Sequence, residues 1–144
     1  MAPRRKSRHV PVVVGLLVFA TAVGVLAYWR FIVSDRYLRE DIATMALAGR
    51  SLTVEQCVDR TVSWASSCRA MKSLCVATGP HLMRTCLAAR ERDAYCARLG
   101  TRGEDTHFGF EECEARGVDR KNKKTCAAAY RAIVTHCARE RGQR

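Results

Sequence analysis

Cysteine is the residue type with the most chemical potential in this chain of 144 residues, which contains eight of them, all at or after position 57. No two stand in a CxxC motif, the close spacing that lowers the pKa of the attacking thiol in thiol oxidoreductases and supplies paired ligands in structural zinc sites. The CxxCH motif of covalently attached haem is absent as well. An even number of cysteines in a short segment instead predicts a disulfide framework in an oxidising compartment.

Helix geometry limits which cysteines can pair. Cys57 and Cys68 are eleven residues apart. On one helix they would share a face but lie about 16 Å apart, whereas a disulfide needs about 4.4–6.8 Å between Cα atoms. Each must therefore reach another helix. In an antiparallel hairpin, two facing residues lie equally far along the chain from the middle of the turn. If Cys57 faces Cys96 and Cys68 faces Cys86, the midpoint of each pair falls near residue 77. That centre lies beside the sequence 77–80, Ala-Thr-Gly-Pro, which predicts a turn.

The other four cysteines complete this scheme. Cys113 and Cys126 flank the turn sequence 116–119, Arg-Gly-Val-Asp, which predicts that they pair across it. Cys75 would then pair with Cys137 and tie the last helix to the hairpin.

A rival scheme pairs Cys75 with Cys86 instead. In that scheme Cys68 pairs with Cys96. The midpoints of the two pairs then agree less well with each other, and Cys57 is left without a partner.

The spacing of the predicted hairpin resembles that of the coiled-coil-helix-coiled-coil-helix (twin Cx9C) proteins of the mitochondrial intermembrane space. The residues that carry the resemblance are Cys57 and Cys68, followed by Cys86 and Cys96, over about forty positions of the chain. The first pair has Cx10C spacing, and four further cysteines have no counterpart in that pattern. Members of that family are mostly assembly factors and subunits of membrane complexes, so the resemblance slightly favours an assembly role.

The polar segment 103–114 is the best candidate for metal or acid–base chemistry, since its loop supplies oxygen and nitrogen ligands from Glu104, Asp105, His107, Glu111 and Glu112. No known ligand spacing is met, and acids at the start of a helix are also expected from the helix dipole. We therefore expect a solvated connection, and predict neither a bound metal nor another cofactor.

A basic cluster stands at the predicted start of the last helix and consists of Arg120, Lys121, Lys123 and Lys124. Basic residues at a helix N-terminus oppose the dipole, so local stability does not account for them. They could bind lipid headgroups, acidic glycan or an acidic partner protein. Nucleic acid is not an expected partner on the outer side of a membrane.

An uncharged apolar segment, 10–29, follows a basic tail that contains Arg4, Arg5, Lys6 and Arg8. Its roughly 20 residues match the thickness of the hydrocarbon core, which predicts a transmembrane helix surrounded by lipid. The basic flank should stay in the cytoplasm, so the cysteine-rich part lies outside it. We expect a bacterial inner membrane with the domain in the periplasm, or alternatively the mitochondrial inner membrane facing the intermembrane space.

Two further features belong to this segment. Small residues at 20–22 would suit signal-peptide cleavage, but the new N-terminus would be strongly apolar, so an uncleaved anchor is the better interpretation. Ala20 and Gly24 form a small-xxx-small pair that could seat another membrane helix.

The remaining pattern predicts an all-α protein, because no strand-like alternation of any length appears. A transmembrane helix should be followed by a small disulfide-stapled helical-hairpin bundle of about four helices. Ser34 could cap a short amphipathic stalk that Gly49 ends, Thr53 and Gln56 form a capping-box pattern, and Asp119 could cap the last helix. The predicted segments are a cytoplasmic tail, 1–9, the anchor, 10–33, the stalk, 34–50, and the extracytoplasmic domain, 51–144.

These observations predict a non-catalytic accessory or assembly subunit of a membrane protein complex, whose other subunits are its partners. The first alternative is a binding module for anionic envelope lipid or glycan that uses the basic cluster. The second is a metal-dependent enzyme that uses the loop from Glu104 to Glu112.

Overall fold

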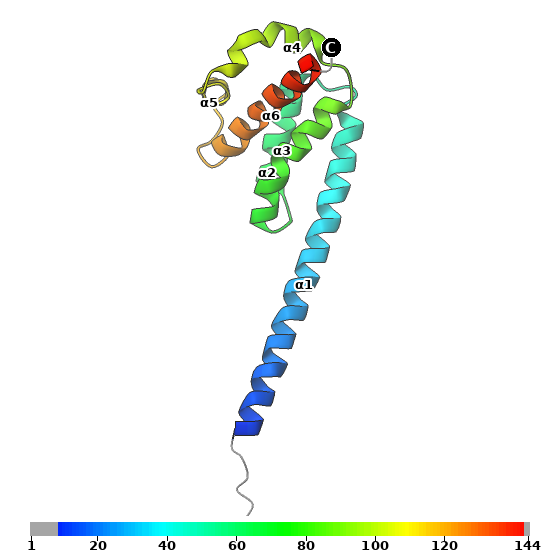
Figure 1. The fold of residues 1–144 in the computed structure, drawn as a ribbon, viewed down its shortest axis with the longest axis vertical. Helices are drawn as coiled ribbons and strands as arrows, with labels where there is room; N and C mark the ends of the chain where they lie inside the picture. Colours follow the sequence, from blue (N-terminus) through cyan, green and yellow to red (C-terminus); the bar gives the residue numbers. More distant parts are fainter. Residues whose placement is uncertain (1–8, 143–144) are drawn as a thin grey trace, which may run out of the picture. The chain divides into compact units, whose positions relative to one another are not determined.

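The computed structural model describes residues 9–142, and over that range all regular secondary structure is helical, with no strand (Figure 1). The predicted all-α class is therefore confirmed. The basic residues from Arg4 to Arg8, predicted to stay in the cytoplasm, lie outside the described residues. The elements are α1 (His9–Ala48), α2 (Val54–Ser67), α3 (Lys72–Ala88), α4 (Asp93–Leu99), a 3-10 turn η1 (Gly100–Glu104), α5 (Phe110–Ala115) and α6 (Lys123–Gly142).

The chain divides into two compact units between Val33 and Ser34. The first is the apolar part of α1, whose large side chains from Val12 to Val33 are exposed. Over Pro11–Ala48 this helix is long and apolar enough to cross a membrane, a description that anchors share with signal sequences near an N-terminus. Together with the disulfides of the second unit, it indicates a membrane-anchored protein with an oxidised domain outside the cytoplasm.

The last turns of α1 belong to the second unit. Leu38 and Met45 are buried, and Ile42 packs against the core. The helix is continuous through Ser34, so the predicted cap at that residue is wrong. Its side chain is instead buried, and its hydroxyl accepts a hydrogen bond from the backbone N–H of Met71 at 3.3 Å.

Gly49 follows the end of α1, as predicted, but for a different reason from a left-handed cap. A Cβ on Gly49 would stand 2.7 Å from the carbonyl oxygen of Cys86 and 2.8 Å from the Cβ of Ala89. The C-terminal ends of α1 and α3 therefore meet closely, and only glycine fits between them.

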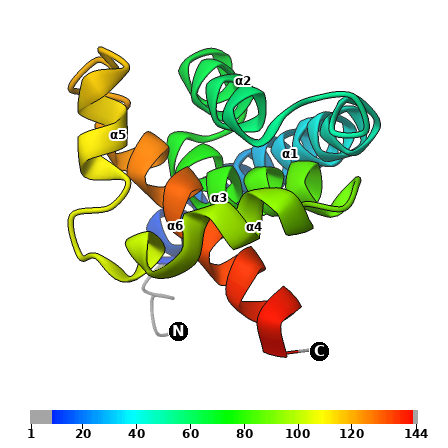
Figure 2. The same ribbon diagram turned by 90° about the horizontal axis from the view of Figure 1, so that it is seen from above.

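Helices α2 and α3 form the hairpin of the second unit (Figure 2). The capping box at its start is present, with Thr53 accepting from the N–H of Gln56 and the Gln56 side chain accepting from the N–H of Thr53. The turn predicted at 77–80 is wrong, because α3 runs through Gly79 and Pro80. The connection lies at residues 68–71 instead, where the backbone of Cys68 and Met71 is extended.

Packing explains why α3 continues through Pro80. A proline inside a helix removes one N–H donor and costs about 3 kcal/mol. Against that cost, α3 buries Leu82, Met83 and Leu87 completely and is held by disulfides near both ends. Tertiary contacts thus override the local breaker.

Moving the turn changes the disulfide pairing. Cys57 bonds Cys86 and Cys68 bonds Cys75, with Cα–Cα distances of 6.0 and 6.1 Å. The midpoint of each pair falls between residues 71 and 72, at the observed turn. The cysteines therefore do pair across an antiparallel hairpin, but the predicted position of its turn is wrong. The predicted bridges from Cys57 to Cys96 and from Cys68 to Cys86 are therefore wrong, as is the rival scheme.

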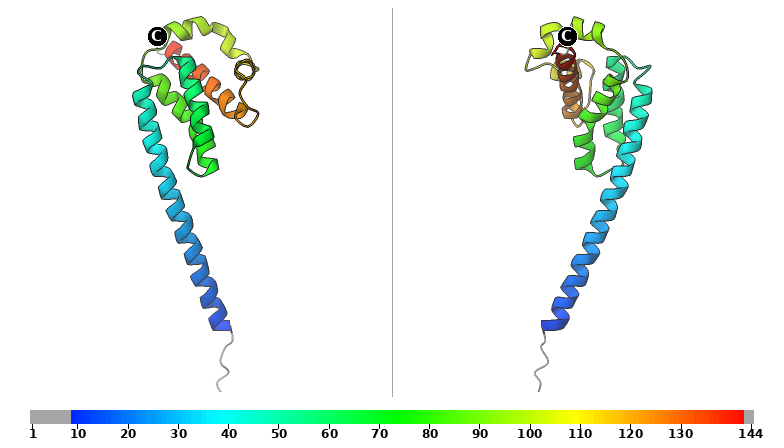
Figure 3. Two further views of the ribbon diagram at one scale, coloured as in Figure 1. Left: turned by 180° about the vertical axis from the view of Figure 1, so that it is seen from behind. Right: turned by 45° about the vertical axis from the view of Figure 1, so that its right-hand side comes forward.

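The other two bridges secure α6. Cys113 bonds Cys126, as predicted, and Cys96 bonds Cys137 in place of the predicted bond between Cys75 and Cys137. Because α3 ends at Ala88, Cys96 belongs to the separate helix α4, which lies against α6 (Figure 3). None of the described cysteines is free.

Candidate functional site

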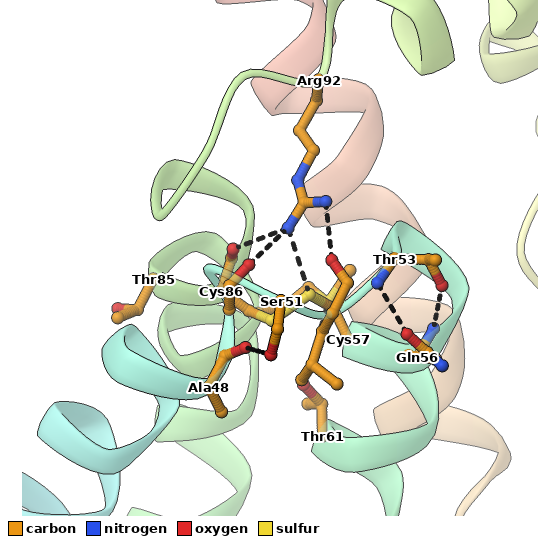
Figure 4. The surroundings of a disulfide bond; sticks show 12 residues. Ala48, Ser51, Thr53, Gln56, Cys57, Thr61, Thr85, Cys86 and Arg92 are labelled. Carbon is orange, nitrogen blue, oxygen red and sulfur yellow. Dashed lines mark hydrogen bonds between the residues drawn. A yellow bond between two sulfur atoms is a disulfide. The ribbon is translucent and has the colours of Figure 1, made fainter.

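The most fully buried cation of the domain is Arg92, in the loop between α3 and α4. Its guanidinium donates to three backbone carbonyls, those of Leu52 at 2.8 Å, Gly49 at 3.0 Å and Cys86 at 3.2 Å, beside the disulfide of Cys57 (Figure 4). These carbonyls lie at or beyond the C-terminal ends of α1 and α3, where backbone acceptors lack helical partners and cations are favoured. Arg92 therefore joins three chain segments through charge-assisted hydrogen bonds without an acidic partner among them.

Burial shapes the electrostatics around this residue. Desolvation and then the like charge of Arg90 lower the pKa of Arg92, which still leaves it charged, as an arginine is in essentially all proteins. Burial also lowers the pKa of His136, with the charges of Arg92 and Arg139 acting in the same direction and Glu140 opposing them. Protonation of His136 is thus disfavoured in the folded domain.

A second polar cluster is centred on the carboxylate of Glu55 in α2. The Tyr95 hydroxyl donates to one oxygen at 2.9 Å, and the Tyr130 hydroxyl donates to the other at 2.9 Å. Arg116 donates to Glu55 and to Asp59. The cluster therefore links α2 to α4, to the end of α5 and to α6.

This cluster keeps its two tyrosines neutral. Burial raises the pKa of both Tyr95 and Tyr130, and the negative charge and hydrogen bonding of Glu55 act in the same direction. A pocket of about 220 Å³ opens beside them. That volume is below the roughly 300–1,000 Å³ of typical small-molecule sites, and both oxygens of Glu55 already accept hydrogen bonds. The geometry supports a structural tie between helices.

The predicted acidic loop is placed around η1 and α5. The carboxylate of Glu112 accepts a hydrogen bond from the guanidinium of Arg102 at 2.9 Å and one from the N–H of Gly109, the N-cap residue of α5, at 2.7 Å. Asp105 accepts from the N–H of His107 at 2.8 Å. Glu104 and Glu111 lie on the same stretch and are exposed. Within residues 9–142 no group of three or more of the usual metal-ligating side chains forms a metal-sized cluster.

The predicted basic cluster lies around the start of α6. Lys123 pairs with Glu114 at 3.7 Å, whereas Arg120, Lys121 and Lys124 are exposed. Asp119 does not cap α6, which begins at Lys123, although its carbonyl accepts the N–H groups of residues 122 and 123. Two of the four basic residues therefore occupy the first turn of α6, where the dipole disfavours them.

Lys121 also lines a groove of about 530 Å³ between α2, α3 and the segment before α6. Val76 forms part of its wall and is 62% exposed, an unusual position for a large apolar side chain of this domain. Asn122 donates to Ser66 at 2.9 Å across the groove, which holds its two sides together. The residues that line it are Ala65, Ser66, Lys72, Cys75, Val76, Asp119, Lys121, Asn122 and Thr125.

The small-residue pair Ala20 and Gly24 lies on the exposed surface of the first unit. A Cβ placed on Gly24 would meet nothing within 4 Å. The described part of the chain thus leaves this stripe uncovered, as seating another membrane helix requires.

Sequence reasoning missed Arg92 and Glu55 because nothing local distinguishes them from other surface charges. Two of the three carbonyls that Arg92 binds, those of Gly49 and Leu52, lie forty or more positions earlier in the chain. The one available signal was its place in a short connection between two cysteine-bearing helices. The groove at Val76 was missed because it depends on the true position of the α2–α3 turn.

Comparison of the chain with protein-family models, with curated proteins and with solved structures gives no match.

Proposed function

We propose that this protein is a single-pass membrane-anchored accessory or assembly subunit of a membrane protein complex, with a non-catalytic role. Its domain would dock on the extracytoplasmic face of a partner subunit. The proposed location is a bacterial inner membrane with the domain in the periplasm, the mitochondrial inner membrane being the alternative. Supporting features are the candidate membrane helix and a domain that four disulfides make rigid.

The observation that carries the proposal is the groove at Val76. Its lining combines an exposed apolar side chain with two basic residues, Lys72 and Lys121, and one acidic residue, Asp119. Interfaces gain affinity from an apolar anchor that excludes water, and charges at the rim improve orientation and association rate. A fitting partner segment would place an apolar side chain against Val76 and carboxylates near the two lysines.

Site-specific photocrosslinking in native membranes tests this docking. A benzophenone amino acid at Val76 should give a discrete adduct with one partner, whereas the same group at the exposed Arg139 on α6 should not. Val76→Glu should then reduce the partner recovered in mild detergent by about thirtyfold, the effect of losing a hot-spot residue of about 2 kcal/mol. Because Val76 is exposed, the stability of the domain should change by less than about 0.5 kcal/mol. Recovery of the protein alone, with no adduct at Val76, contradicts the proposal.

A second candidate function is binding of anionic envelope lipid or glycan through the basic cluster. The supporting observation is that Arg120 and Lys124 are exposed and make no ion pair with any described residue. Retention on acidic lipid or glycan should fall as salt rises, because screening weakens exposed charges. The double variant Arg120→Glu, Lys124→Glu leaves the groove lining intact, so it separates this function from partner docking. Unchanged retention after charge reversal excludes the lipid or glycan role.

A further inference from the structure

A pocket of about 380 Å³ lies between the second-unit part of α1 and the C-terminal end of α2. Its walls combine two aromatic rings, both signs of charge and a hydroxyl. The lining residues used below are Tyr37, Glu40, Asp41, Trp64, Ser67 and Arg69.

Chain connectivity places this pocket close to the end of the apolar segment. Ser34 follows Val33 directly, and its hydroxyl holds the α2–α3 loop at Met71. Tyr37 comes one helical turn later, about 6 Å along the helix axis from Val33. The headgroup layer on each side of a bilayer is about 5–7 Å thick. If the span ends at Val33, Tyr37 lies within the headgroup layer and Glu40, about 10 Å along the axis, lies just beyond it, so the pocket starts in the headgroup layer on the side of the domain.

The charges of the pocket are not paired with each other. Arg69 and Glu40 line the same space and are exposed, and neither forms an ion pair with any described residue. Asp41 accepts the indole N–H of Trp64 at 2.7 Å, which fixes the ring in the pocket wall. A guanidinium binds phosphate strongly, and aromatic faces and carboxylates attract ammonium groups.

We propose that this pocket binds the headgroup of a zwitterionic phospholipid. Arg69 holds the phosphate, whereas the hydroxyl of Ser67 already donates to the carbonyls of Ser63 at 3.2 Å and Trp64 at 3.3 Å and takes no part. Glu40, with the rings of Tyr37 and Trp64, holds the amine. A ligand carrying both charges satisfies Arg69 and Glu40 together, which an anion alone does not do. The inference rests on the membrane anchoring within the proposed function and is independent of partner docking at Val76.

Fluorescence of Trp64 in the full chain tests the site. Trp29→Phe, at an exposed position of α1, leaves Trp64 as the single tryptophan. The variant in neutral detergent is titrated with dihexanoyl phosphatidylethanolamine and, separately, with dihexanoyl phosphatidylglycerol. The emission should saturate with phosphatidylethanolamine at a concentration about tenfold lower than with phosphatidylglycerol.

Two pocket variants and one control assign the groups. Arg69→Gln should raise the half-saturation for both lipids about tenfold. Glu40→Gln should abolish the preference for phosphatidylethanolamine and leave phosphatidylglycerol unchanged. Arg139→Gln, on the exposed end of α6, should behave as the parent. Equal response to both lipids, a preference that survives Glu40→Gln, or an equal response to inorganic phosphate overturns the proposal. Such a result would leave the crosslinking at Val76 unaffected, so the proposals of headgroup binding and of partner docking can be refuted independently of each other.

Discussion

Replacing Arg92 by methionine should be among the most damaging single changes outside the disulfides. The side chain is only 5% exposed, and its guanidinium serves the carbonyls of Gly49, Leu52 and Cys86. Methionine matches much of the volume and flexibility of arginine but donates no hydrogen bond. The variant therefore leaves backbone acceptors in a buried place without their donor.

The expected loss follows from the number of bonds. A hydrogen bond to a charged group contributes about 1.5–3 kcal/mol. The carbonyl of Cys86 keeps the N–H of Ala89 at 3.4 Å, so two carbonyls, those of Gly49 and Leu52, bear most of the loss. Relief from burying a guanidinium offsets part of it. We expect about 3–5 kcal/mol, or two to four powers of ten in the folding equilibrium.

Urea unfolding of the oxidised protein in detergent measures this difference. Trp64 fluorescence in a Trp29→Phe background reports on the domain rather than on the anchor. Arg92→Lys should lose about half as much as the methionine variant, since a compact ammonium reaches fewer of the carbonyls. Arg90→Met is the matched control, because Arg90 is an exposed arginine in the same connection, and it should stay within about 0.5 kcal/mol of the parent. If the free energy of unfolding of Arg92→Met lies within about 1 kcal/mol of the parent value, the loss is no more than that of an ordinary surface substitution, and the proposed role of Arg92 is refuted.

Three other outcomes follow from the structure. The Cys68–Cys75 bridge closes only a seven-residue separation and has one partly exposed cysteine, so a water-soluble reductant should open it first. Its removal should lower the free energy of unfolding by about 2 kcal/mol, against roughly 3–4 kcal/mol for the buried bridges. Mass spectrometry of alkylated peptides after graded reduction should show that order; simultaneous opening of all four contradicts it. Tyr130→Phe should cost about 1.5–3 kcal/mol at neutral pH, and its deficit should shrink above pH 10, where the unfolded tyrosine of the parent ionises while the folded one stays neutral. If the difference in unfolding free energy between the parent and Tyr130→Phe grows above pH 10, the prediction is contradicted. Because the pKa of His136 is lowered in the folded domain, the unfolded imidazole takes up a proton first, and the free energy of unfolding falls as the pH drops below 6.5. His136→Gln should make this decrease smaller when urea unfolding is measured across the acid pH range. An unchanged decrease contradicts the prediction.

Local chemistry accounts for the features that the sequence predicted correctly. A long uncharged run predicts the apolar helix, because every backbone group of a helix is satisfied within the segment itself. The capping box at Thr53 and Gln56 involves residues three positions apart. Cys113 and Cys126 pair across the connection between α5 and α6, where Gly117 follows α5 at a φ of 65°. Each of these depends on neighbours in the chain, so each could be predicted from the sequence.

The sequence by itself determined an apolar helix joined to a helical domain whose cysteines all pair. Only the tertiary structure decided which cysteines pair, because the hairpin turn lies at residues 68–71, where no glycine or proline marks it, while the marked position at Pro80 stays helical. The burial of α3 outweighs the local cost of that proline, and this balance is set by residues from distant parts of the chain. The same holds for Glu55 and Arg92, because the partners of Glu55 and two of the three carbonyl partners of Arg92 lie forty positions away or more. Their roles come from burial and hydrogen bonding, which exist only once the helices have packed.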